Sequence, residues 1–230
     1  MTRPVARPRA VAQVPDQAHE RGGPSRSGVF PGGGLGATAA RRVYSVRVSR
    51  EVALNAVSDG QTLYSFSQRG LLVASRLRDG RLRWSHPFKR SPQAAPARVG
   101  KLVVAGDPHG RVWALDAATG KVVWRQKVVG AVSMSPLPAG DTVVIGTRAG
   151  RLVALALRDG AMRWQVKIRR VFLAGAATAD GSGLILVSSD RHVRRVDAKR
   201  GVVVWHHRLP ASSVVCPVVA GGAAYVLGAG

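Results

Sequence analysis

The stretch GRVWALDAATGKVVW, residues 110–124, decides the fold of this chain. It returns in altered form as GLLVASRLRDGRLRW (70–84), GRLVALALRDGAMRW (150–164) and RHVRRVDAKRGVVVW (191–205). The repeat places an aromatic residue at nearly constant spacing, and these residues are Tyr44, Trp84, Trp124, Trp164 and Trp205. A period of about 40 residues is typical of propeller blades or of helical solenoids.

Short apolar runs rich in β-branched residues favour the propeller. KLVVAG (101–106), DTVVIG (141–146) and GLILVS (183–188) read as strands bounded by turn residues. No segment repeats apolar residues at helical spacing over three turns. One unit resolves into four strands, which we expect at 91–97, 101–106, 111–116 and 121–128. The sequence therefore predicts an all-β fold, a β-propeller of four-stranded blades.

A glycine stands four residues before each tryptophan, and these glycines are Gly80, Gly120, Gly160 and Gly201. Glycine supplies the positive φ that a tight hairpin needs between the third and fourth strands. The tryptophan offers about 150–250 Å² of largely apolar contact. We predict that the aromatic residues and glycines are structural anchors that join neighbouring blades. A ring of tryptophans stacking on a planar ligand is the alternative, disfavoured because every unit carries one at the same register.

The repeat, and GRVWALDAATGKVVW above all, resembles the tryptophan-docking, PQQ-like repeat of quinoprotein alcohol dehydrogenases and of the BamB family of outer-membrane assembly lipoproteins. The resemblance covers residues 44–230. It implies a propeller, commonly of eight blades, in the periplasm or on the periplasmic face of the outer membrane. It does not decide between an enzyme and a scaffold, because the same fold hosts both.

The dehydrogenase side of this resemblance implies adjacent disulfide-bonded cysteines, a calcium ion on Glu, Asn and Asp ligands, and an Asp base. This chain has one cysteine, Cys216, and its only glutamates are Glu20 and Glu51. Oxygen ligands for a hard cation are therefore scarce. We expect no bound cofactor, no metal site and no catalytic residue.

Three other candidates have simpler structural interpretations. His206 and His207 are neighbours on a predicted strand, so their side chains point to opposite faces and cannot chelate one metal from that strand alone. DPHG (107–110) joins an Asp and a His, but sister units place ordinary turns there. Cys216 falls in a predicted apolar strand and has the character of a buried structural thiol.

The chain is strongly basic, with 35 Lys and Arg against 12 Asp and Glu and a formal net charge of +23. Many arginines fall in the third and fourth strands of the units, which lie toward the outer rim of a propeller. This set is Arg76, Arg78, Arg81, Arg83, Arg111, Arg125, Arg148, Arg151, Arg158, Arg163, Arg194 and Arg195. A basic rim would attract anionic surfaces or acidic segments, although high-G+C codon usage also explains the arginines. Nucleic acid is disfavoured because aromatic and basic residues do not interleave on one face.

The first 43 residues, rich in Pro, Gly and Arg, are predicted to be a disordered leader. They contain neither the apolar stretch of a signal peptide nor a lipidation cysteine, and no apolar segment of the chain is long enough to span a membrane. The sequence itself therefore leaves the location open.

The predicted blades are residues 51–90, 91–130, 131–170 and 171–211, followed by a partial blade at 212–230. Tyr44 would belong to a fourth strand before the first blade. We expect an incomplete ring from a fragment of a longer protein. A small closed ring, and a homodimer in which two chains complete one propeller, are the alternatives.

Three functions fit these features. The first is a non-enzymatic scaffold that binds protein partners, as in BamB-like support of outer-membrane assembly. The second is a fragment of a PQQ-dependent alcohol dehydrogenase whose cofactor residues lie in other blades. The third is a sensory propeller module of a multidomain protein.

Overall fold

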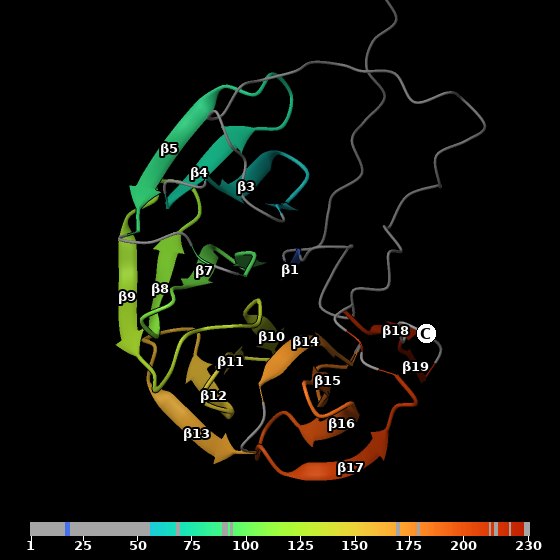
Figure 1. Cartoon of the computed structure of the whole chain (residues 1–230). Coiled ribbons are helices and arrows are strands. Elements are labelled where there is room, and N and C mark those ends of the chain that lie inside the picture. The colour runs from blue at the N-terminus through green and yellow to red at the C-terminus, as the bar shows by residue number, and fades with distance from the viewer. Residues whose placement is uncertain are drawn as a thin grey trace, which may run out of the picture.

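The computed structural model describes residues 17–18, 56–67, 70–88, 92, 94–168, 171–178, 180–211, 213, 216–220 and 222–227. All regular elements within these ranges are β-strands, and they form antiparallel sheets arranged in an arc (Figure 1). The all-β fold and the four-stranded blades predicted from the repeat are confirmed. Tyr44 lies outside the described residues.

Four sheets follow one another along the chain. The first is ordered β2-β3-β4-β5, with strands Val57–Ser58, Thr62–Phe66, Leu71–Arg76 and Leu82–Pro87. The second contains β6 to β9, with strands Ala97–Val99, Leu102–Gly106, Arg111–Asp116 and Val122–Lys127. The third contains β10 to β13, with strands Leu137–Ala139, Thr142–Gly146, Arg151–Ala156 and Met162–Lys167.

The fourth sheet and a final hairpin complete the described arc. The fourth contains β14 to β17, with strands Phe172–Ala177, Gly183–Ser188, His192–Asp197 and Val203–Arg208. The hairpin consists of β18 and β19, with strands Val218–Ala220 and Ala223–Tyr225. A short strand, β1 (Gln17–Ala18), pairs antiparallel with β6. The other residues of the predicted leader lie outside the described ranges, so its disorder stays a prediction.

The first strand of the second unit starts later than its sequence suggests. We expected it at 91–97, but β6 covers only Ala97–Val99. Pro92 and Pro96 lack the N–H that a strand ladder needs, so pairing with β7 begins only after the second proline.

Each sheet runs from the inside of the arc to its outside. The first strands of successive blades contact one another, β2 with β6, β6 with β10, β10 with β14 and β14 with β18. Strands β5, β9, β13 and β17 lie on the outside of the arc (Figure 1). The outer strands are therefore sheet edges, and the blades meet through their faces.

The core consists of layers between neighbouring blades rather than one central cluster. Blades one and two enclose Tyr64, Phe66, Leu72, Val103 and Leu115. The next two layers have the same character, built from Val112, Ile145, Val153 and Leu155 and then from Leu137, Leu152, Phe172, Leu184 and Leu186. Burial of apolar area between stacked repeats is what stabilises such an architecture.

A β-bulge occurs in the outer strand of every complete blade. In blade two, Ala114 pairs with Trp124 but Leu115 pairs with Val122, so Val123 is the extra residue. The pairings of the other blades give the same irregularity, with Arg83, Arg163 and Val204 as the extra residues. The bulge lies directly before the tryptophan and re-aims it relative to the start of its strand.

Candidate functional site

Trp124 shows how two blades are joined. Its side chain extends from β9 of blade two, and the residue is only 6% exposed. The indole Nε1–H donates to the carbonyl of Leu157 in blade three at 2.7 Å. The ring lies over Gly160, where an added Cβ would come within 2.6 Å of the indole Cε3, and the φ of Gly160 is +72°. This hairpin residue is therefore glycine for two independent reasons.

The same junction recurs on both sides. Trp84 donates to the carbonyl of Ala117 at 2.9 Å and covers Gly120. Trp164 donates to the carbonyl of Ala198 at 2.9 Å and covers Gly201. Each donor and acceptor are 33 or 34 residues apart, so each of these three tryptophans bonds to the blade that follows its own.

Trp205 has different surroundings. It is partly exposed, and its ring centroid lies 5.2 Å from that of His207. It packs against a small cluster that includes Ile185 and Val219, and no indole hydrogen bond joins it to another described residue. Gly80 has the φ of its sister glycines, +71°, at the hairpin of blade one.

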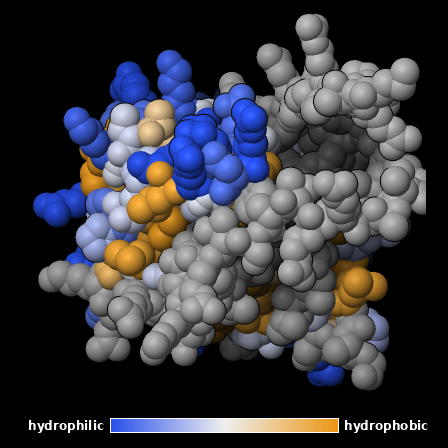
Figure 2. Space-filling model, turned by 90° about the horizontal axis from the view of Figure 1, so that it is seen from above, coloured by the Kyte–Doolittle hydropathy of each residue, from blue (hydrophilic) through white to orange (hydrophobic). Residues whose placement is uncertain are grey.

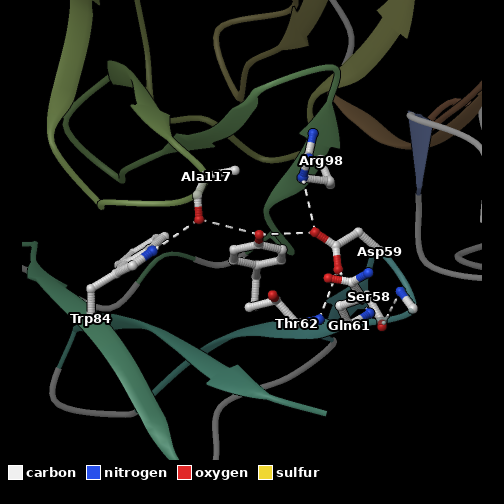
Figure 3. Close-up of polar contacts among 9 residues, drawn as sticks. Ser58, Asp59, Gln61, Thr62, Trp84, Arg98 and Ala117 are labelled. Atoms are coloured by element: carbon white, nitrogen blue, oxygen red, sulfur yellow. Dashed lines mark hydrogen bonds and ion pairs between the residues drawn. The ribbon is translucent and has the colours of Figure 1, made fainter. Parts of the chain in front are cut away.

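The junction between blades one and two carries an additional polar cluster (Figure 3). The Tyr64 hydroxyl lies 3.3 Å from the Ala117 carbonyl and 3.1 Å from Asp59 Oδ2. Arg98 Nε, from blade two, donates to the same Asp59 oxygen at 3.3 Å. This ion pair therefore links the two blades close to their inner strands.

The pKa values of this cluster reflect its burial and its hydrogen bonds. Burial opposes ionisation of Asp59, but the N–H groups of Thr62 and Gln61, the Tyr64 hydroxyl and the Arg98 charge outweigh it and lower the pKa of Asp59. Burial, and then the charge of Asp59, raise the pKa of Tyr64. Asp59 is therefore held as a carboxylate, which serves as the counter-charge of Arg98.

Asp107 decides the interpretation of the DPHG segment. Its side chain is fully buried, and Oδ1 accepts the N–H groups of His109 and Arg111 at 2.8 and 2.9 Å. Arg111 Nε donates to Oδ2 at 2.9 Å. The carboxylate binds the backbone of His109, so the segment is a turn, as predicted, and not an acid and base pair.

Most other carboxylates serve turns in the same way. Six more aspartates accept backbone N–H groups within their own hairpins, and these are Asp59, Asp79, Asp116, Asp159, Asp180 and Asp197. The side chains of Thr178 and Ser182, together with the Ser182 N–H, lower the pKa of Asp180 to about 2. Such hydrogen bonds favour the ionised form and fix the local backbone.

The predicted basic rim is wrong at one position, Arg194. It was expected on the rim, but it is only 8% exposed. Its guanidinium makes a bidentate ion pair with Asp190, at 2.6 and 3.1 Å, and also donates to Ser188 Oγ. The hydrogen bonds from Arg194 hold the pKa of Asp190 well below its usual range. Arg194 is a structural cation within its blade, because a carboxylate four residues earlier captures it.

The other singled-out residues lie at the surface or close to it. His206 and His207 are exposed; His206 lies 5.5 Å from His192 between ring centroids, while His207 contacts Trp205. Cys216 is half-buried and precedes β18, so it is not the buried strand residue that we expected. Pro217 directly follows Cys216 and lacks the N–H that a strand ladder needs, so β18 begins only at Val218.

Metal ligands are not assembled in the part of the chain that the structure describes, where no three His, Cys, Asp or Glu side chains form a group suited to an ion. In the same ranges there is no helix long and apolar enough to cross a membrane. The described polar groups instead build the blade junctions and the turns.

Sequence reasoning missed the acceptors of the junctions. The carbonyls of Ala117, Leu157 and Ala198 are backbone atoms, so their residue types carry no signal. Their spacing does carry one, because each stands three residues before the hairpin glycine. The Asp190 and Arg194 pair could also have been found from its i, i+4 spacing at a turn.

Four-stranded sheets joined by tryptophans that dock on the glycine hairpin of the next sheet define a β-propeller of the tryptophan-docking type. The family model described as "Outer membrane protein assembly factor BamB" matches residues 32–174, more than half of the chain. The chain belongs to this family. A search of curated protein sequences finds no match.

Three solved structures show the same fold. BamB from Moraxella catarrhalis aligns with a TM-score of 0.68 and 22% identity over 81% of this chain and 57% of its own. Quinohemoprotein alcohol dehydrogenase from Comamonas testosteroni gives 0.61 and 15%, over 77% and 39%. Quinohemoprotein alcohol dehydrogenase ADHIIG from Pseudomonas putida HK5 gives 0.56 and 15%, over 72% and 36%. This chain thus spans little more than half of the BamB structure and less of the dehydrogenases.

Proposed function

We propose that this protein is a non-enzymatic propeller scaffold that binds protein segments and supports outer-membrane protein assembly. The observation that carries the proposal is the match of residues 32–174 to the BamB family. The fold supplies rigid blades whose edges and loops are available for binding, a common way for β-structures to recognise peptides.

The use of the carboxylates supports a scaffold over an enzyme. General acid or base catalysis needs a side chain that can reach a substrate proton. Seven described aspartates are engaged by backbone N–H groups of turns, and Asp190 is engaged by Arg194. These groups are held where the fold needs them.

Photo-crosslinking tests the proposal. A photoreactive amino acid placed in the exposed turns between second and third strands, for example at Arg148, should capture unfolded outer-membrane β-barrel precursors. Soluble unfolded proteins of similar size serve as the control. Equal capture of both classes, or of neither, would contradict an assembly role.

A piece of a quinone-dependent dehydrogenase is the second candidate, favoured by the similarity to two quinohemoprotein alcohol dehydrogenases. Spectroscopic titration with pyrroloquinoline quinone and Ca²⁺ separates the candidates when it is made on the complete ring, because the cofactor residues of a dehydrogenase would lie in other blades. Saturable binding with alcohol-dependent reduction would support the enzyme, whereas a featureless titration of the complete ring supports the scaffold.

The described arc ends in two strands rather than in a four-stranded sheet. β18 and β19 form a hairpin beside β14, in the position of the first two strands of a further blade. We propose that the complete ring contains more strands than this chain supplies. Sedimentation equilibrium would distinguish closure between two chains from a monomer, and the homodimer stays a prediction until then.

A further inference from the structure

The four outer strands share a backbone geometry but differ in the side chains along their edges. Each is the last strand of its sheet among the described strands. The first and third residues after the tryptophan are Ser85 and Pro87 on β5, Arg125 and Lys127 on β9, Gln165 and Lys167 on β13, and His206 and Arg208 on β17. Only on β9 are both of these residues permanently cationic.

At Arg125 and Lys127, the backbone N–H groups of β9 also point away from the sheet. Val128 N–H donates to Gly110 O, and Gln126 pairs with Val112 in the ladder with β8. Because hydrogen-bonded and non-bonded positions alternate along an antiparallel pair, the N–H and C=O groups of Arg125 and Lys127 point away from β8. On β5 the corresponding Pro87 has no N–H to offer.

The charge of the β9 edge is not neutralised within its blade. Residues 94–130 contain six Lys and Arg but only Asp107 and Asp116 as acids. Asp107 is buried against Arg111, and Asp116 accepts from Thr119. Lys127 Nζ donates to the His109 carbonyl, and no described residue forms an ion pair with Arg125. The Arg125 guanidinium and the remaining N–H groups of Lys127 can therefore bind another anion.

Apolar residues flank these cations. Val122, Val123 and Val129 are 45, 52 and 56% exposed. Seen from above, the molecule also presents hydrophilic residues beside hydrophobic ones on that face (Figure 2). Lysine on a sheet edge commonly prevents pairing with neutral strands, and the same charge favours a strand of opposite sign.

We propose that β9 is a docking edge for an extended acidic peptide, which pairs with β9 as an added outer strand of blade two. Glu or Asp at alternate positions would face Arg125 and Lys127, while backbone hydrogen bonds form to their outward N–H and C=O groups. This inference rests on the proposed scaffold function and names the class of segment bound. Duplex nucleic acid fits less well, because it offers phosphates but no backbone to extend a sheet.

The test uses a short fluorescein-labelled peptide in which Glu alternates with Thr, titrated against the full chain in low salt. R125E/K127E should weaken binding by about tenfold or more, since two attractive contacts become repulsive. R163E/K167E on β13 is the matched control, with the same change in net charge, and should weaken binding by less than about threefold. Equal losses in both variants would overturn the proposal in favour of a diffuse basic rim.

Two further probes separate strand pairing from charge alone. A peptide N-methylated at alternate amides keeps its charges but cannot form the ladder, so it should bind about tenfold more weakly. In the complex, amide exchange of Arg125 and Lys127 should slow while that of Gln165 stays unchanged. Undiminished binding of the methylated peptide, or tighter binding of a DNA duplex or anionic vesicle, would overturn the proposal. If the charge-reversal variant R125E/K127E fails to fold, the neutral variant R125Q/K127Q is used in its place.

Crosslinking of β-barrel precursors to R125E/K127E distinguishes the two proposals. Unchanged precursor capture together with intact acidic-peptide binding would reject the β9 edge and leave the scaffold function standing. Acidic-peptide binding at β9 without any precursor capture would reject the assembly role and retain the edge.

Discussion

Trp124 and Trp205 occupy the same place in the repeat but not the same environment. Trp124 is enclosed between blades two and three, with its indole N–H on the Leu157 carbonyl and its ring over Gly160. Trp205 is partly exposed beside His207 and packs against a small cluster. The repeat thus specifies the residue, while the next blade determines what that residue contributes to stability.

The contrast identifies the blade junction as the unit of stability. A blade buries its faces against its neighbours, so an outer strand is stabilised by the following sheet as well as by its own. A junction residue should therefore contribute most to stability where the following sheet encloses it.

The largest expected effect is the loss of a docked tryptophan. Trp124→Ala should lower the free energy of unfolding by about 3–5 kcal/mol, because it removes a buried ring and leaves a cavity. Trp205→Ala should cost less than about 2 kcal/mol, because less apolar area is lost. Urea unfolding followed by far-UV circular dichroism measures both, and equal costs would contradict the comparison.

The glycine beneath the tryptophan comes next. Gly160→Ala should lower the free energy of unfolding by about 2–4 kcal/mol. The added methyl group would clash with the Trp124 ring, and alanine adopts a positive φ less readily than glycine. Gly140 is the matched control, since its φ is +59° and nothing lies within 4 Å of an added Cβ. Gly140→Ala should cost about 1–2 kcal/mol. Similar midpoints for the two variants in urea would show that the tryptophan does not rest on Gly160.

A smaller effect is expected at the Asp190 and Arg194 pair. Asp190→Asn should cost about 1–3 kcal/mol at neutral pH, because it leaves the Arg194 guanidinium buried without its counter-charge. Since the pKa of Asp190 is lowered in the folded state, its contribution is present above the ordinary carboxyl pKa of about 4 and is lost as the pH falls further.

The pH dependence gives the measurement for this pair. Urea midpoints of the wild type and Asp190→Asn should differ at pH values near 7 and converge in strongly acidic buffer. A difference that does not change with pH would mean that packing, rather than the ionised carboxylate, accounts for the cost.

The smallest effect is expected at Tyr64. Tyr64→Phe should cost about 0.5–1.5 kcal/mol, the usual range for one hydrogen bond. The Ala117 carbonyl keeps its bond from Trp84 at 2.9 Å, and Asp59 keeps Arg98 and its turn N–H groups. A loss above about 3 kcal/mol would show that the hydroxyl, rather than the tryptophan, holds this junction.

The fold was predictable from sequence because the spacing of the repeat gives the length of one blade. The glycines and tryptophans around 120–124 and 160–164 stand at equal spacing, and the turn chemistry between strands is local. The late start of β6 was not anticipated, although Pro92 and Pro96 hinted at it. Arginine position was harder, because Arg111 and Arg194 are drawn inward by aspartates four residues earlier.

The candidate surfaces were only partly predictable. Composition predicts a basic rim, but which cations remain exposed depends on pairing across strands and turns. Asp190 forms an ion pair with Arg194 and holds it inside the blade. Arg125 and Lys127 stay at the edge because both carboxylates of blade two are engaged by other residues. A backbone acceptor such as the Leu157 carbonyl cannot be read from residue type at all.

Hydrogen exchange of the indole N–H groups tests the blade junction most directly. In ¹⁵N–¹H spectra, assigned with single Trp→Phe variants, the indole protons of Trp84, Trp124 and Trp164 should exchange slowly because each is bonded to a carbonyl of the next blade. The indole proton of Trp205 should exchange much faster. Fast exchange at Trp124, or equal protection at Trp124 and Trp205, would contradict the account.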